Sequence, residues 1–226
     1  MKTTKLLGTK TMPQNGVSVV TTTWNERLTI ETLILRIRTV FRGIPHEIIV
    51  VDGGSTDGTI DIARPLADLA VTKKKEGQTM GLLHGMRLAK YPVIVTIDSD
   101  LENSPECIPE LISKTDEYDI VVASRTEIPR ISVKIASKTL GKLFGVTDSF
   151  SNYRAYRREV VSKFNLKGGE TFGAEFLVIA KKNRLRIDEI SYEPPPMRKN
   201  PRIGGTIKAN LRITWALVKS LRIYLT

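Results

Sequence analysis

Short apolar runs, each closed by a polar cluster, alternate with stretches of helical spacing, and this alternation constrains the fold most. Residues 17–20, 47–51 and 93–97 are almost wholly apolar, as strands buried on both faces are. Such strands separated by helices are typical of an α/β fold with a mostly parallel central sheet and helices on both faces. The other expected strands are 70–72 and 119–123, and the expected helices are 27–40, 59–69, 79–90 and 106–113.

Length and composition set the outer limits. With 226 residues, 41% of them apolar and 26% charged, the chain is expected to form one globular domain. No apolar run reaches the roughly 20 residues that cross a bilayer, and the start does not resemble a signal peptide. The single cysteine, Cys107, excludes an internal disulfide and fits a reducing compartment. We expect a flexible tail over 1–15, the domain over 16–196 and a basic amphipathic segment over 197–226.

The sharpest chemical feature is the pair Asp98 and Asp100, at the end of the expected strand 93–97. Two carboxylates at this spacing can share one hard divalent cation, Mg²⁺ or Mn²⁺, which takes its remaining ligands from phosphate oxygens. Glu102 lies two residues further on and can supply a third ligand. The alternative is a solvated acidic turn. Ligands of such folds bind at the carboxyl ends of the strands, which favours the metal site.

The second feature is the segment 52–59, Asp-Gly-Gly-Ser-Thr-Asp-Gly-Thr. Its glycines permit a tight turn and a close approach of the backbone to a ligand, and Asp57 or Ser55 can cap the following helix. Asp52 can accept hydrogen bonds from a ribose or a base. An ordinary strand–helix turn would need the same glycines. The segment is neither a G-x-G-x-x-G nor a Walker sequence, so dinucleotide and ATP binding are disfavoured.

Taken in order, these segments resemble the inverting family 2 glycosyltransferases of GT-A fold, the family of dolichol-phosphate mannose synthase and other polyprenyl-phosphate glycosyltransferases. Residues 22–26, Thr-Thr-Trp-Asn-Glu, are similar to the family's P-T-Y-N-E. Residues 50–59 resemble V-D-D-x-S-x-D-G-T, and residues 98–106 resemble D-A-D-L-x-H-P-P-E. Residues 148–156 are similar to D-x-x-S-G-F-R-A-Y. The resemblance extends from about residue 17 to about residue 208.

The resemblance implies a single GT-A domain and a role for individual residues. The residues expected in catalysis are Asp98, Asp100 and Arg125. Those expected to hold the nucleotide-sugar are Thr22, Trp24, Asn25, Glu26, Asp52, Gly77, Asp98, Ser99 and Asp100. The expected ligands of Mg²⁺ or Mn²⁺ are Asp98, Asp100 and Glu102. The residues expected to bind phosphates of the donor or the acceptor are Arg125, Arg130, Lys134, Ser151, Arg198 and Arg202, most of them the forked donors that suit this task.

The sequence departs from the family pattern at three informative positions. Gly53 replaces the second acidic residue of V-D-D, which leaves the choice between GDP- and UDP-sugars open. Asn103 replaces the usual His, and Asn152 replaces the usual Gly near the acceptor.

The formal net charge of +11 is concentrated in two segments. Residues 128–145 contain four basic residues and residues 197–226 contain seven, and neither segment contains an acid. Basic residues beside apolar ones are typical of helices that lie in a membrane interface. A core-packing helix with a wet basic face is the alternative. With the resemblance, this pattern predicts a peripheral enzyme on the cytoplasmic face of a membrane, acting alone or with a separate membrane subunit.

The predicted reaction is transfer of a sugar, mannose or glucose, from a nucleotide-sugar to a polyprenyl phosphate. The alternative is a soluble family 2 enzyme with a hydroxyl acceptor, which would need a carboxylate as base. A nucleic-acid-binding module is suggested by charge alone, but the basic segments hold few aromatic residues to stack on bases. We therefore expect no nucleic-acid partner. An inactive sugar-nucleotide binder is disfavoured because Asp98 and Asp100 are both present.

Overall fold

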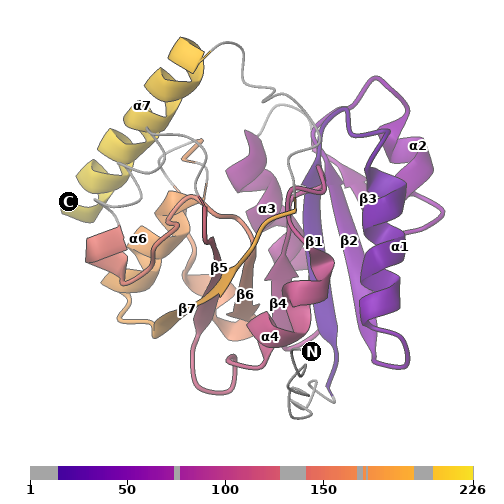
Figure 1. Ribbon diagram of the computed structural model, residues 1–226, viewed down its shortest axis with the longest axis horizontal. Helices are drawn as coiled ribbons and strands as arrows, with labels where there is room; N and C mark the ends of the chain where they lie inside the picture. Colours follow the sequence, from indigo (N-terminus) through magenta and orange to yellow (C-terminus); the bar gives the residue numbers. More distant parts are fainter. Residues whose placement is uncertain are drawn as a thin grey trace, which may run out of the picture.

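The computed structural model describes residues 15–73, 77–127, 141–166, 170–171, 173–195 and 206–225. Its centre is a seven-stranded sheet in the order β3-β2-β1-β4-β6-β5-β7 (Figure 1). All strands are parallel except β6, which runs antiparallel to both β4 and β5. The mostly parallel α/β sheet predicted from the sequence is thus confirmed. The strands are β1 (Val17–Thr23), β2 (His46–Asp52), β3 (Leu69–Thr72), β4 (Val93–Thr96), β5 (Ile120–Arg125), β6 (Arg154–Arg157) and β7 (Ile187–Tyr192).

Helices cover both faces of the sheet because its strands are apolar on both sides. Val20 and Ile49 pack on one face with α3 and α6, whereas Val19 and Ile48 pack on the other with α1 and α4. Successive strand residues point to opposite faces, so a continuous apolar run fills two cores at once. The α-helices are α1 (Ile30–Val40), α2 (Thr59–Ala63), α3 (Gly77–Leu88), α4 (Ile108–Ile112), α6 (Ala174–Lys182) and α7 (Thr206–Leu225), and the 3₁₀ helices are η1 (Pro105–Cys107) and η2 (Arg158–Lys163).

Several elements differ from the sequence-based expectation. The helices η2 and α6 and the strand β7 were not expected, and two further differences have a local reason. The helix expected over 59–69 ends at Ala63, and Leu69 already belongs to β3. Pro65 has no N–H to continue the helical hydrogen bonds, so the chain passes into turns before the strand. Strand β6 was not expected, because its sequence, Arg-Ala-Tyr-Arg, carries no apolar run. Its Arg154 is nonetheless fully buried.

Helix α7 lies beside α6 at one end of the molecule (Figure 1). Ala216 and Ser220 face the protein, whereas Trp215, Val218 and Leu225 are 61%, 47% and 82% exposed. The helix therefore keeps an apolar stripe on its outer side. None of the helices in the described part of the chain is long and apolar enough to cross a membrane.

Candidate active site

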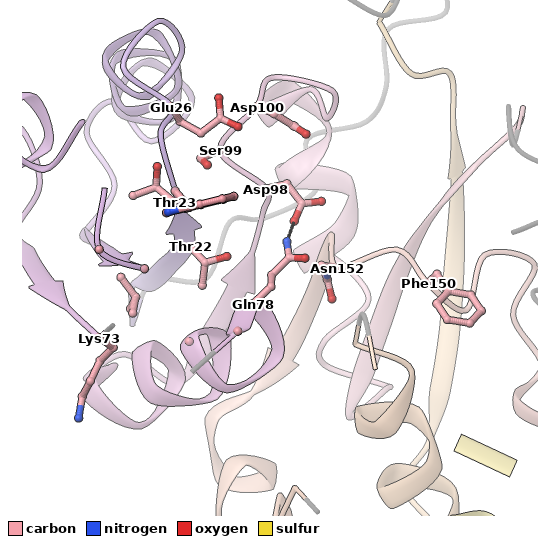
Figure 2. A pocket seen from close by; sticks show the side chains of 16 residues that line it. Thr22, Thr23, Glu26, Lys73, Gln78, Asp98, Ser99, Asp100, Phe150 and Asn152 are labelled. Carbon is pink, nitrogen blue, oxygen red and sulfur yellow. Dashed lines mark hydrogen bonds between the residues drawn. The ribbon is translucent and has the colours of Figure 1, made fainter. Parts of the chain in front are cut away.

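A cavity of about 740 Å³ opens at the carboxyl ends of the parallel strands (Figure 2). Sites of this fold type form there, because the strand ends leave a crevice between the following loops. The β1 end, the turn after β2, the start of α3 and the loop after β4 all contribute side chains. The lining residues are Thr22, Thr23, Trp24, Glu26, Val51, Gly53, Gly54, Lys73, Gly77, Gln78, Gly81, Asp98, Ser99, Asp100, Phe150 and Asn152.

The segment after β1 is held against the turn after β2. The amide N of Asn25 donates to Ser55 Oγ (2.9 Å), and Asn25 Oδ1 accepts from the Thr56 amide (2.9 Å). The amide N of Glu26 donates to Thr59 Oγ1 (2.8 Å). These bonds fix Glu26, which is buried and lines the cavity. Asn25 itself serves the contact between the two loops, and among the described residues it is not one that lines the cavity.

Asp52 organises the glycine turn. Its carboxylate accepts from the Gly54 amide (2.9 Å), the Ser55 amide (3.0 Å) and Ser55 Oγ (2.5 Å). Gly53 and Gly54 line the cavity, whereas Asp52 is buried and is not among the described lining residues. A Cβ atom at Gly53 would lie 3.5 Å from the nearest atom, Thr23 O, which is ordinary van der Waals contact. Glycine at position 53 is therefore not a steric requirement.

The carboxylate of Asp98 is held from two sides by carboxamides. Gln78 Nε2 donates to Asp98 Oδ1 (2.7 Å), as Figure 2 shows. Asn103 Nδ2 donates to Oδ2 (3.1 Å). Burial and the nearby Asp100 carboxylate raise the pKa of Asp98 to about 7, although Arg125 and the Asn103 hydrogen bond oppose the rise. The raised pKa means that the ionised form of Asp98 is disfavoured. A positive charge beside the carboxylate would stabilise that form.

Asp100 lies with Asp98 on the cavity wall, and its Oδ1 accepts from the Glu102 amide (3.0 Å) across a tight turn. Leu101 makes that turn with a φ of 64°, an uncommon conformation for a branched side chain. Strain of this kind persists where the surrounding structure enforces it, as at ligand sites.

The donor set fits a hard divalent cation that is shared with a phosphate ligand. Within the described residues, no group of three or more His, Cys, Asp and Glu side chains could hold a metal by itself. Asp98 and Asp100 offer oxygen ligands only, and Mg²⁺ in such sites takes one or two carboxylates and completes its shell from substrate phosphates. Glu102 acts on Asp98 electrostatically and, of the described acids near the pair, is not one that lines the cavity.

Arg125 ends β5 and forms an ion pair with the fully buried Asp148 (Nε to Oδ2, 2.7 Å). Burial lowers the pKa of Arg125, but the Asp148 carboxylate more than offsets this effect and the pKa is raised. Ser151 is buried and accepts from the Tyr153 amide (3.2 Å). Among the described residues, Arg125 and Ser151 are not lining residues of the cavity. The other expected phosphate-binding residues, Arg130, Lys134, Arg198 and Arg202, lie outside the described residues.

Several lining residues were not singled out as site residues from the sequence. Lys73 directly follows β3, so the rule that ligands bind at strand ends would have found it. Gln78 and Phe150 carry no such signal. Gln78 is placed by the start of α3, where Glu170 Oε2 accepts from its amide N (2.6 Å). Gly77, expected to bind the donor, lines the cavity with a φ of 78°, a conformation that favours glycine.

Comparison with known proteins places this geometry in a family. The model of Glycosyl transferase family 2 matches residues 18–174. A dolichol-phosphate mannosyltransferase of Pyrococcus furiosus is 29% identical over 90% of this chain and 64% of its own length. An undecaprenyl-phosphate 4-deoxy-4-formamido-L-arabinose transferase of Pectobacterium atrosepticum is 33% identical over 65% of this chain and 50% of its own length. The chain thus spans between about half and two thirds of the length of these curated relatives.

Solved structures of similar fold include glucosyl-3-phosphoglycerate synthase from Mycobacterium tuberculosis. Its complex with phosphoglyceric acid has a TM-score of 0.75 and 23% identity, covering 91% of this chain and 80% of that one. Its complex with Mn²⁺, uridine diphosphate and phosphoglyceric acid has a TM-score of 0.75 and 21% identity, covering 91% and 78%. These likenesses establish a GT-A type of fold. The family model covers all the strand ends that line the cavity, and the chain belongs to glycosyl transferase family 2.

Proposed function

We propose that this chain is a metal-dependent, inverting glycosyltransferase that moves a sugar, mannose or glucose, from a nucleotide-sugar to a polyprenyl phosphate. The observation that carries the proposal is the pair Asp98 and Asp100 on the wall of a strand-end cavity. The cavity, about 740 Å³, is in the range that encloses small ligands. The names of the relatives in Pyrococcus furiosus and Pectobacterium atrosepticum support a polyprenyl-phosphate acceptor.

The donor half of the reaction follows from the lining residues. Thr22 and Glu26 offer polar groups at the end of β1, and Lys73 adds a positive charge after β3. Asp98 and Asp100 would hold Mg²⁺ or Mn²⁺, which offsets the negative charge that develops on a departing nucleotide diphosphate. Gln78 and Asn103 keep the Asp98 carboxylate in one orientation for that task.

The acceptor half needs no general base if the acceptor is a lipid phosphate. A phosphate oxygen is already anionic near neutral pH and attacks the sugar carbon from the side opposite the diphosphate. Arg125, anchored by Asp148, carries the charge that would orient such a phosphate. A guanidinium fork is suited to two-point binding of phosphate oxygens.

The exposed face of helix α7 supports binding of the chain to a membrane surface. Its outer stripe combines Trp215, Val218 and Leu225 with the exposed Arg222. Aromatic and aliphatic groups beside basic ones suit the headgroup region of a bilayer. We therefore propose peripheral binding to the cytoplasmic face of a membrane, with or without a separate membrane subunit.

A soluble acceptor is the second candidate. The enzyme from Mycobacterium tuberculosis with a similar fold has been solved with phosphoglyceric acid, which carries a phosphate on a small molecule. A hydroxyl acceptor of this kind would need a base to take its proton. Glu26, Asp98 and Asp100 are the cavity carboxylates within the described residues.

Competition between acceptors tests the proposal. The protein is given radiolabelled GDP-mannose or UDP-glucose with Mn²⁺, and polyprenyl phosphate in detergent together with phosphoglyceric acid. We expect label in the organic phase, and its loss when polyprenyl phosphate is replaced by the free alcohol. Label that stays in a water-soluble product would favour the second candidate. Donor left intact with both acceptors would contradict the proposed transfer.

A further inference from the structure

Asn103 is a buried carboxamide whose two ends have different partners. It lies in the loop after β4 and is only 6% exposed. Its Nδ2 donates to Asp98 Oδ2 (3.1 Å), and its Oδ1 accepts from the hydroxyl of Tyr192. The family pattern has a His at this position, so this arrangement is a property of the present sequence.

Tyr192 reaches this loop from a distant part of the chain. It is the last residue of β7, separated from Asn103 by 89 residues, and is 5% exposed. Burial raises its pKa, so its hydroxyl keeps the proton that it donates. Its ring packs edge-on against Tyr153, with centroids 5.7 Å apart at 84°, and its carbonyl accepts from the Thr126 amide (3.0 Å). The phenol is therefore held in place without help from Asn103.

The three groups determine one another's orientation. An ionised carboxylate only accepts hydrogen bonds, so Asn103 must turn its NH₂ group toward Asp98. Its oxygen is then buried and needs a donor, which Tyr192 provides. A carboxamide with that oxygen unsatisfied would pay a desolvation penalty and could rotate away from Asp98.

We propose that Asn103 and Tyr192 are positioning residues for the donor site: Tyr192 orients the Asn103 carboxamide, and Asn103 fixes the Asp98 carboxylate in the orientation in which it meets the nucleotide and its cation. The inference rests on the proposed function. It extends the donor site to β7, the last strand before the C-terminal part of the chain.

The two carboxamides that hold Asp98, those of Gln78 and Asn103, are uncharged, and this affects cation binding. Each carboxylate oxygen has more than one lone pair, so one hydrogen bond from a carboxamide to each Asp98 oxygen leaves acceptor capacity. A carboxamide donor carries no charge, so it orients the carboxylate without competing with a divalent cation for it. The pair Gln78 and Asn103 thus differs from an arginine clamp, which would neutralise Asp98.

The test compares two buried tyrosines that pack against each other. Tyr192→Phe removes the hydroxyl that orients Asn103 and keeps the ring. Tyr153→Phe is the matched control, because the Tyr153 hydroxyl donates to the backbone carbonyl of Ser104 (2.9 Å) rather than to the Asn103 carboxamide. For each variant, Mn²⁺-dependent binding of UDP and of GDP is measured by calorimetry, and the thermal unfolding midpoint is measured without ligand.

We expect both variants to lower the unfolding midpoint, but only Tyr192→Phe to weaken metal-dependent nucleotide binding, by about threefold to tenfold, the size of one hydrogen bond. Binding of the nucleotide in EDTA should change less. Asn103→Leu should weaken metal-dependent binding at least as much. Because Tyr192 acts through Asn103, the double variant should bind as Asn103→Leu alone does.

The outcomes separate this inference from the function on which it rests. Equal nucleotide affinity in Tyr192→Phe and Tyr153→Phe would show that Tyr192 has a structural role only. It would overturn the proposal that Tyr192 and Asn103 position Asp98. Additive losses of nucleotide affinity from Tyr192→Phe and Asn103→Leu would also overturn it. A wild-type chain that binds neither nucleotide with Mn²⁺ would overturn the donor proposal itself.

Discussion

The two halves of the sheet differ in how their polar residues relate to the cavity. In the half from β1 to β4, the strand ends place Thr22, Glu26 and Asp98 directly on the cavity wall. In the half from β5 to β7, Arg125 and Ser151 lie in contact with their own neighbours, Asp148 and Tyr153, and line no part of the cavity in the described structure. In the proposed reaction, the donor side is therefore the one whose strand-end motifs line the cavity, whereas Arg125 and Ser151, expected on the acceptor side, lie outside that lining.

In the proposed reaction, the donor and the acceptor place different demands on the cavity. A nucleotide diphosphate needs carboxylates for a cation and close backbone approach, and both are encoded within short motifs. An acceptor makes no such demand on short motifs, because side chains from several elements can bind it. Variants on the donor side should therefore affect transfer to every acceptor, and variants on the acceptor side should discriminate between acceptors.

The largest effect is expected on the donor side. Asp100→Asn keeps the size of the side chain but removes one negative charge from the pair that would hold the cation. We expect transfer to fall by about a hundredfold or more with any acceptor. Initial rates at saturating Mn²⁺ measure it, with the exposed Asp116→Asn as the control for a lost surface charge. A loss of transfer to one acceptor only would contradict the assignment of Asp100 to the donor side.

On the acceptor side, Arg125→Lys keeps the charge but loses the fork. We expect transfer to polyprenyl phosphate to fall by about tenfold while the affinity for the nucleotide is unchanged. Steady-state rates at varied acceptor and calorimetry with UDP and GDP check the two parts. Weakened nucleotide binding would instead assign Arg125 to the donor diphosphate.

Gly53→Asp tests whether the turn after β2 lies near the base of the nucleotide. A side chain fits at position 53, since the nearest atom to an added Cβ is 3.5 Å away. A carboxylate there accepts hydrogen bonds, and the guanine edge offers more N–H donors than the uracil edge. We expect the ratio of GDP to UDP affinity to rise severalfold, by about the value of one charge-assisted hydrogen bond. An unchanged ratio would place the base away from this turn.

Trp215→Ala tests the membrane surface on the acceptor side. Trp215 is 61% exposed on α7, so its loss removes apolar area without opening a cavity. We expect co-sedimentation with anionic vesicles to fall by about threefold or more, with the unfolding midpoint nearly unchanged. The exposed Leu35→Ala, on α1, is the control. Equal loss in both variants would argue against α7 as the membrane-binding helix.

The smallest effect concerns stability below neutral pH. The Arg36 guanidinium holds the pKa of Glu106 at about 2, below its ordinary 4.5. Because the pKa is depressed in the folded chain, the stabilisation is complete above about pH 4.5 and is lost as the pH falls toward 2. Glu106→Gln should flatten this part of the pH dependence of the unfolding midpoint. An unchanged profile would mean that the exposed pair contributes nothing measurable.

Much of the fold could be predicted because the apolar runs of β1, β2 and β4 are continuous. The sequence of β6 could not reveal a strand, since it carries no apolar run and its buried Arg154 donates through Nη1 and Nη2 to the carbonyls of Gly173 and Ser149. That burial arises only once the sheet is assembled. Local pattern therefore fails where tertiary contacts supply the partners.

The candidate site shows the same division. The motif residues Asp98 and Asp100 were predicted from their spacing, their position after a strand and the family resemblance, and they line the cavity. Gln78 and Tyr192 were not, because their contacts with Asp98 and Asn103 span 20 and 89 residues. Side chains that position a ligand-binding group carry no local signature when they come from a different element.

Metal-dependent sugar transfer by the unmodified chain tests the proposed activity and the metal role of Asp98 and Asp100 together. The protein is incubated with radiolabelled GDP- and UDP-sugars and polyprenyl phosphate, in Mn²⁺ or in EDTA. We expect labelled glycolipid with at least one donor in Mn²⁺ and its loss in EDTA. Equal transfer in EDTA would contradict the metal role of Asp98 and Asp100, and no turnover of any donor, with any acceptor, would contradict the proposed glycosyltransferase activity.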